Sequence, residues 1–229
     1  MLKYPEMTLD LYNSSDNINI NSEGIVLSLN TYGDKNIYAG LFLMDYGRVN
    51  ASLQHYSPMK KNTSRELQQF SWARFEIIQN KRTRNYYIKD LNIISDSSRI
   101  NMNRDALHTA LRWSEIVKKY LIPKQADNEL LNNLRDNMKL LESPGIVPVH
   151  AADFRFIWLW LEEWGLAPDL ITFYGSKNFN DDEIVLLTQI QRLNSDSVIK
   201  LLSYHVSKNI RKNALRIASD LALNFFNQK

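Results

Sequence analysis

The spacing of hydrophobic positions changes near residue 100. Before that point the apolar residues form short runs separated by turn signals such as Asp45-Tyr46-Gly47, and this pattern is typical of β-strands. After Asn103 they recur every three to four positions, which is the period of a helix. The pattern predicts five strands, over about 25–29, 37–44, 49–53, 70–78 and 86–94, and then six helices, which begin near 107, 130, 151, 181, 195 and 210.

These elements predict an α+β fold, in which a five-stranded antiparallel barrel or sandwich precedes an all-helical domain. We expect a polar leader or one added strand over residues 1–21, a sheet domain over 22–98 and a helical domain over 99–229. The predicted helix from Ala151 to Trp164 carries aromatic residues on all of its faces, so it should be buried at the centre of the helical domain.

The composition narrows the class of protein. With 44% hydrophobic residues, the chain of 229 residues can bury a substantial core. It has no Cys, which excludes disulfides, a Cys zinc site and a Cys nucleophile and favours a reducing compartment. The first 21 residues are polar, and the longest apolar run, at 156–161, is too short to span a bilayer. We therefore expect a cytoplasmic protein without a membrane segment.

Residues for catalysis or metal binding do not gather in the sequence. Four His are scattered without a second ligand at helical spacing, and neither a Gly-rich phosphate loop nor a nucleophile elbow occurs. The acidic clusters Glu162-Glu163 and Asp181-Asp182-Glu183 consist of neighbours that point in different directions from a helix, so they do not converge on one substrate atom. We expect no enzyme activity, no metal and no cofactor.

Basic residues concentrate in the predicted sheet domain, although the net charge of the chain is only +3. From residue 48 to 89 there are nine basic residues and two acidic ones, and two basic clusters fall in predicted loops, at 60–65 and 81–84. Cations beside aromatic rings suit single-stranded nucleic acid, and in an OB-type barrel the loop between strands four and five is a binding loop. Basic loops and strand-filling tyrosines are equally common without a ligand. The predicted DNA-binding residues are Arg48, Lys60, Lys61, Arg65, Arg74, Lys81, Arg82, Arg84, Lys89, Tyr46 and Tyr86.

Several stretches, in matching order along the chain, give it a resemblance to the RecO recombination-mediator family of bacteria. Gly24-Ile25-Val26-Leu27 and Tyr46-Gly47-Arg48-Val49 look like opening barrel strands of that family. Gly165-Leu166-Ala167-Pro168-Asp169-Leu170 is similar to the segment after its central helix, and Leu201-Leu202-Ser203-Tyr204-His205 looks like its penultimate helix. Many members carry a four-cysteine zinc site soon after the Pro-x-Leu turn. Residues 171–179 contain no Cys here, so the resemblance is to a zinc-free member.

The resemblance implies an OB-fold barrel that binds single- and double-stranded DNA and anneals complementary strands. It also implies that the protein acts with RecR to load the RecA recombinase onto strands covered by single-stranded-DNA-binding protein (SSB). The implied location is the nucleoid in the bacterial cytoplasm. The helical domain would recognise the acidic, apolar C-terminal tail of SSB, which needs a cation for the terminal carboxylate and an apolar cleft. The predicted partner-binding residues are Arg155, Lys208, Arg211, Lys212 and Arg216.

The residues themselves leave alternatives open. The four basic residues near the start of the last predicted helix oppose its macrodipole, which favours an acidic ligand, but they also fit a solvated face. The chain could be an adaptor whose barrel docks on an acidic protein, an RNA-binding barrel, or an enzyme whose site no motif marks.

Overall fold

The computed structural model describes residues 17–32, 36–53, 67–143, 147–175, 179–204 and 208–227. The chain divides into two compact units. The sheet unit comprises the described residues up to Asp96 together with Ile122–Ala126, and the helical unit comprises Ser97–Leu121 and the residues from Asp127 onward. Residues 122–126, which the pattern assigned to the helical domain, belong to the sheet unit.

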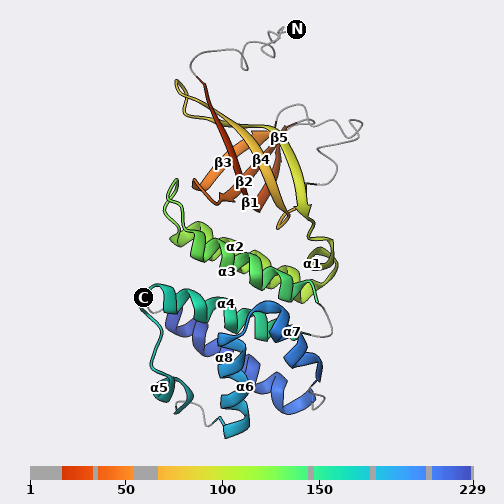
Figure 1. Ribbon diagram of the computed structural model, residues 1–229, viewed down its shortest axis with the longest axis vertical. Coiled ribbons are helices and arrows are strands. Elements are labelled where there is room, and N and C mark those ends of the chain that lie inside the picture. Colours follow the sequence, from red (N-terminus) through yellow and green to blue (C-terminus); the bar gives the residue numbers. More distant parts are fainter. Residues whose placement is uncertain are drawn as a thin grey trace. The chain divides into compact units, whose positions relative to one another are not determined.

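Five strands form one closed sheet in the order β1-β2-β3-β5-β4 (Figure 1). The α+β organisation is therefore confirmed, but the prediction of a purely antiparallel sheet is wrong, because β3 and β5 run parallel, with Ser52 beside Tyr87. A closed ring with an odd number of strands cannot alternate in direction all the way round, so the sheet is mixed. The strands are β1 (Asn17–Tyr32), β2 (Asn36–Leu43), β3 (Gly47–Leu53), β4 (Trp72–Asn80) and β5 (Tyr86–Ser95).

Strand β1 is longer than its apolar pattern predicts, because it pairs with two neighbours. Its first part, from Asn17 to Ile25, pairs with β4, and its second part, from Gly24 to Tyr32, pairs with β2. The two ladders overlap at Gly24 and Ile25. A Cβ on Gly24 would lie 2.2 Å from the Phe42 carbonyl oxygen, so this crossing point needs a glycine. Residues 17–21, predicted as part of a loose leader or of one added strand, are the first part of β1, and β4 satisfies their backbone hydrogen bonds.

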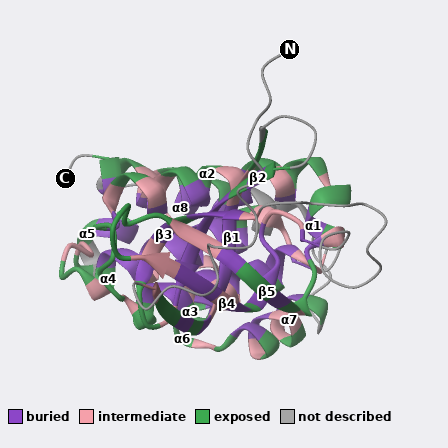
Figure 2. Cartoon of the chain, turned by 90° about the horizontal axis from the view of Figure 1, so that it is seen from above, coloured by how far each residue is buried: buried purple, intermediate pink, exposed green. Residues whose placement is uncertain are grey.

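Alternate residues of the strands fill the interior of the sheet unit. Val26, Leu41, Val49, Phe75 and Ile77 are buried in one apolar cluster, and the buried parts of the strands are purple in Figure 2. Because side chains alternate between the two faces of a strand, the residues between them point outward. This alternation sets which polar residues are available for binding.

The helical unit is organised around α4 (Val149–Glu163), which packs against α2, α3, α6 and α8. Ten of its fifteen residues are buried, which confirms the prediction of a central aromatic helix. Of the described helices, none combines the length and the apolar character that crossing a membrane requires. The short helices α1 and α5 lacked a sequence signal. The other helices are α1 (Ser98–Met102), α2 (Arg104–Tyr120), α3 (Asn128–Leu141), α5 (Leu170–Gly175), α6 (Asp181–Arg192), α7 (Ser195–Tyr204) and α8 (Lys208–Asn227).

A buried carboxylate joins three helices of this unit. Asp153 on α4 is 2% exposed and accepts hydrogen bonds from Trp113 Nε1 on α2, at 2.8 Å, and from Ser219 Oγ on α8. Arg112 adds an ion pair, with 2.5 Å between Nη2 and Asp153 Oδ1. A buried charge is tolerated only when it is paired and hydrogen-bonded, so Asp153 requires its partners on α2 and α8 to stay beside it.

A second carboxyl group, Glu163 at the end of α4, is held in its neutral form. Burial raises the pKa of Glu163 to about 8, and a hydrogen bond with Asp127 and the negative charges of Asp127 and Glu129 contribute to the increase. Asp127 also caps α3 by accepting a hydrogen bond from the Leu130 N–H at 2.9 Å. The pKa of Glu163 therefore depends on the two acidic residues at the start of α3.

Replacing Glu163 by Gln should change how stability depends on pH. An unfolded Glu ionises near pH 4.5, so folding takes up a proton between pH 4.5 and about 8, and the wild-type protein loses stability as pH rises through that window. The melting temperature of E163Q minus that of wild type should therefore be larger at pH 9 than at pH 5. The control is Glu115→Gln, an exposed carboxyl on α2. A difference between E163Q and wild type that does not vary with pH would contradict this account.

Gly47, the first residue of β3, lies against the backbone of the segment Ile122–Ala126. It has a φ of +65°, and a Cβ there would lie 1.9 Å from the Gln125 carbonyl oxygen. Gly165 has the same φ of +65°, but no atom lies within 4 Å of its Cβ position. Substituting each glycine in turn therefore distinguishes the energetic cost of a left-handed backbone from that of a steric clash.

Gly47→Ala should lower the free energy of unfolding by at least about 2 kcal/mol, because it adds a clash to the left-handed strain. Gly165→Ala should cost only about 1 kcal/mol, from the strain alone. Urea unfolding followed by circular dichroism measures both variants. Equal losses would show that the close approach at Gly47 has no energetic weight.

Candidate nucleic-acid interface

The loop between β4 and β5 carries three exposed cations and has a defined turn. The Asn80 Oδ1 accepts hydrogen bonds from the backbone N–H groups of Arg82, at 3.0 Å, and Thr83, at 2.9 Å. The Arg84 N–H donates to the Asn80 carbonyl at 2.7 Å, and the Asn80 N–H donates to the Asn85 carbonyl at 3.0 Å. Asn is favoured at such a position because its side chain bonds the backbone ahead of it. The turn thus holds the loop cations at the end of a hairpin.

Lys81, Arg82 and Arg84 are cationic side chains at the surface of the sheet unit. All three are exposed, and within the described part of the chain none of them forms an ion pair with a carboxylate. A cation without an acidic partner can neutralise a phosphate, whereas a cation already in an ion pair must first give up that partner. These three residues therefore form an exposed positive group in the sheet unit.

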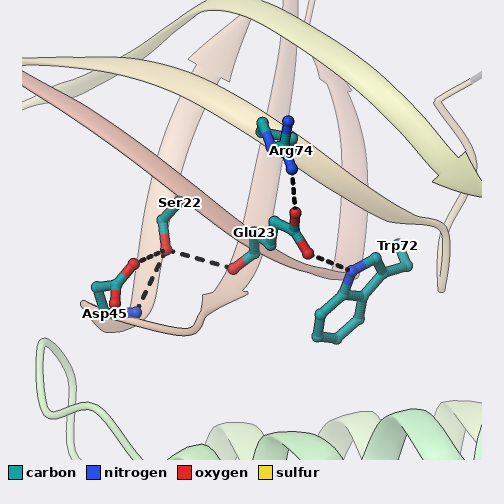
Figure 3. A network of polar contacts seen from close by, with 5 residues as sticks. All are labelled: Ser22, Glu23, Asp45, Trp72 and Arg74. Atoms are coloured by element: carbon teal, nitrogen blue, oxygen red, sulfur yellow. Dashed lines mark hydrogen bonds and ion pairs between the residues drawn. The ribbon is translucent and has the colours of Figure 1, made fainter.

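Two cations predicted to bind DNA are instead paired across the sheet. Arg74 on β4 contacts Glu23 on β1, with 2.6 Å between Nη2 and Oε1, and Glu23 also accepts a hydrogen bond from Trp72 Nε1 at 3.4 Å (Figure 3). Lys89 on β5 forms an ion pair with Glu76 on β4. Charge along the strands is therefore largely balanced, and the excess positive charge lies at the strand ends.

An outward row of β2, β3 and β5 carries two tyrosines that flank a small residue. Tyr38 on β2 is the direct neighbour of Ser52 on β3, and Ser52 is the direct neighbour of Tyr87 on β5. Directly paired residues share a face, and the residues next to them in sequence point into the core, so these three side chains lie on the outer face. Tyr38 is 50% exposed. Exposed rings on a sheet face can stack with bases.

Tyr38 was not among the DNA-binding residues predicted from the sequence, because it is far from the basic clusters along the chain. Its position beside β3 and β5 follows only from the strand pairing. Of the predicted tyrosines, Tyr46 is exposed in the turn between β2 and β3. Tyr86 is half-buried against the core, and the Lys124 ammonium lies 5.4 Å from the centre of its ring.

The segment Ile122–Ala126 adds a cation, Lys124, to the sheet unit, although the sequence pattern placed this residue in the helical domain. Pro123 forms a parallel bridge with Arg48 at the start of β3, and the Lys124 N–H donates to the Arg48 carbonyl at 3.1 Å. This contact brings Lys124 beside Arg48 and Arg84. No local sequence signal predicts it, because Lys124 follows a predicted helix.

The remaining predicted residues have different positions. Lys60, Lys61 and Arg65 lie outside the described residues, as do the side chains of Lys208, Arg211 and Lys212 on α8. Arg216 is exposed on α8. Arg155 is only 6% exposed, and its Nε and Nη2 atoms donate to the Leu193 carbonyl at 3.2 and 3.0 Å. Burial lowers the pKa of Arg155, against the charge of Asp136.

Comparison with known proteins gives no relative: no protein-family model and no curated protein matches the chain. Among the described residues, no group of three or more His, Asp or Glu side chains is arranged to hold a metal ion. The geometry of the sheet unit is therefore the main basis for a functional assignment.

Proposed function

We propose that this protein is a recombination mediator of the RecO type, which binds single- and double-stranded DNA and anneals complementary strands. The observation that carries the proposal is the set of exposed loop cations, Lys81, Arg82 and Arg84, none of which forms an ion pair with a carboxylate among the described residues. They lie on the same closed sheet that bears Tyr38 and Tyr87 on its outer face. Cations bind the phosphates and rings stack with the bases, which are the two components of single-strand binding.

We further propose that the sheet is an OB-type barrel. In that fold, five strands form a Greek-key barrel, and the outer face of strands two and three and the loop between strands four and five bind oligonucleotides. The closed order β1-β2-β3-β5-β4 and the five strands agree with this description. Tyr38 and Asn50 lie on the outer face of β2 and β3, and the basic loop connects β4 to β5.

This chemistry suits annealing without sequence preference. Contacts to phosphates position a strand but do not read its bases. The loop cations are long, exposed side chains, which suits contact with the phosphates of a strand. Two complementary strands held in this way remain free to pair with each other.

Neutralising the loop should reduce the salt dependence of binding. In the variant Lys81→Gln/Arg82→Gln/Arg84→Gln, the slope of log K against log salt for a single-stranded oligonucleotide should fall by about 2, because each phosphate contact on a single strand contributes about 0.7. The matched control, Arg74→Gln/Glu23→Gln, removes an ion pair without changing net charge, and its slope should equal that of wild type. Fluorescence anisotropy at several salt concentrations measures all three proteins.

An unchanged slope in the loop variant would remove this loop from the binding site. If wild-type protein bound no oligonucleotide at low salt but bound an acidic peptide, the protein would be an adaptor for acidic partners. Equal affinity for an RNA strand of the same sequence would extend the proposal to RNA.

The partners are proposed from the resemblance alone. We propose that the protein acts with RecR, helps to load RecA onto SSB-covered strands, and binds the SSB tail through the basic part of α8, which includes Arg216. Arg155 is left out of this site, because its guanidinium is buried and engaged with the Leu193 carbonyl.

Annealing of SSB-covered strands should depend on the SSB tail. Removing the tail should slow annealing by the wild-type protein, because the acidic tail then no longer contacts the cations of α8. A variant with Lys208, Arg211, Lys212 and Arg216 all replaced by Gln should anneal at the slow rate with either form of SSB. A rate that ignores the tail in the wild-type protein would refute the tail part of the proposal.

A further inference from the structure

Three cations of the sheet unit line one small pocket. It has a volume of about 240 Å³ and lies between the start of β3, the start of β5 and the segment Ile122–Ala126. The charged side chains are Arg48, Arg84 and Lys124, and no acidic residue is among the described residues that line it. The pocket is smaller than one for a drug-sized ligand, so it suits a single small anionic group. Its polar lining is completed by Asn50 and Asn85.

One donor of a residue that lines this pocket has no acceptor among the described residues. The Nε of Arg48 is buried and forms no hydrogen bond with any described residue. A buried donor without a partner carries a desolvation cost, which an anionic oxygen in the pocket would remove. Arginine presents its N–H groups in a planar fork that matches the oxygens of phosphate.

The backbone is strained at two of the three cations. Within the described part of the chain, three residues other than glycine have a positive φ, and two of them are Arg84, at +59°, and Lys124, at +64°. A left-handed backbone is unfavourable for a residue with a side chain, and such strain concentrates at functional sites. Asn and Gly, which adopt this conformation more easily, do not occupy either position.

The position of the Lys124 ammonium is also restricted. It lies 5.4 Å from the centre of the Tyr86 ring, within the range of a cation–π contact. The Lys124 N–H donates to the Arg48 carbonyl, and Gly47 allows the close approach of Gln125. The pocket is therefore built from two segments far apart in sequence.

We infer that the pocket of Arg48, Arg84 and Lys124 is a phosphate-binding subsite that holds one phosphate group of a bound nucleic-acid strand. This inference rests on the proposed function for the identity of the strand. The phosphate can be an internal phosphodiester or a terminal phosphomonoester, which share the same oxygens and differ in charge. Tyr86 then acts as a support for Lys124.

The test uses the Nε–H signal of Arg48 in nitrogen-15 NMR spectra of the full chain, assigned with Arg48→Lys. Inorganic phosphate, added against chloride at constant ionic strength, should shift this signal with saturation. Lys124→Gln should weaken phosphate binding about tenfold, as expected for one charge-assisted contact of about 1.4 kcal/mol. Lys124→Arg should bind as wild type does, and Lys200→Gln, the same change of charge in the helical unit, should have no effect.

Lys124→Gly separates a binding role from a structural one. Glycine relieves the positive φ, so the melting temperature should stay equal to that of wild type or rise, while phosphate binding weakens as in Lys124→Gln. A residue that served only the fold would not give this combination. A Lys124→Gly protein with wild-type phosphate affinity would overturn the inference.

Three oligonucleotides of one sequence identify the source of the phosphate: one with a 5′-phosphate, one with a 3′-phosphate and one with hydroxyls at both ends. A shift of the Arg48 signal with all three assigns the pocket to an internal phosphodiester, and a shift only with a phosphorylated end assigns it to a terminus. Oligonucleotide binding without any response of Arg48 would overturn the subsite and leave the proposed function intact. A response to inorganic phosphate without oligonucleotide binding would refute the proposed function and leave the pocket intact.

Discussion

The sheet unit depends on one strand that serves two neighbours. Strand β1 pairs with β4 through its first part and with β2 through its second, and the two ladders overlap at Gly24 and Ile25. Without this double pairing, β2 and β4 would be open edges with unpaired backbone groups. Closure also accounts for the parallel pair β3–β5, because an odd number of strands in a ring leaves one pair in the same direction.

This closure determines where positive charge is available. Pairing of β1 with β4 places Glu23 beside Arg74, and pairing of β4 with β5 places Glu76 near Lys89, so these strand cations are balanced. The parallel pair brings the start of β5 beside the start of β3. The cations that remain without a described acidic partner are therefore those of the β4–β5 loop and its surroundings. The proposed binding surface therefore consists of cations whose charge is not balanced by an acidic residue across the described strands.

The helical unit follows a different physical rule. Its central helix α4 is apolar on nearly every face, and a helix of that kind has few orientational constraints from hydrophobic packing alone. The buried Asp153 supplies a constraint, since its charge is acceptable only with Trp113, Arg112 and Ser219 in place. The polar groups inside this unit thus select the arrangement, and its apolar groups supply the driving force.

The sequence by itself determined the type of most elements and the segment that carries the basic residues. Periods of two and of three to four residues are local properties, so they predicted the strands, the long helices and the buried character of α4. The tertiary structure alone decided that 17–21 is strand, that β3 and β5 run parallel, that Arg155 is interior and that Lys124 joins the sheet unit. Each of these depends on a partner far away in sequence, and the local period of apolar residues does not specify which distant segment that partner is.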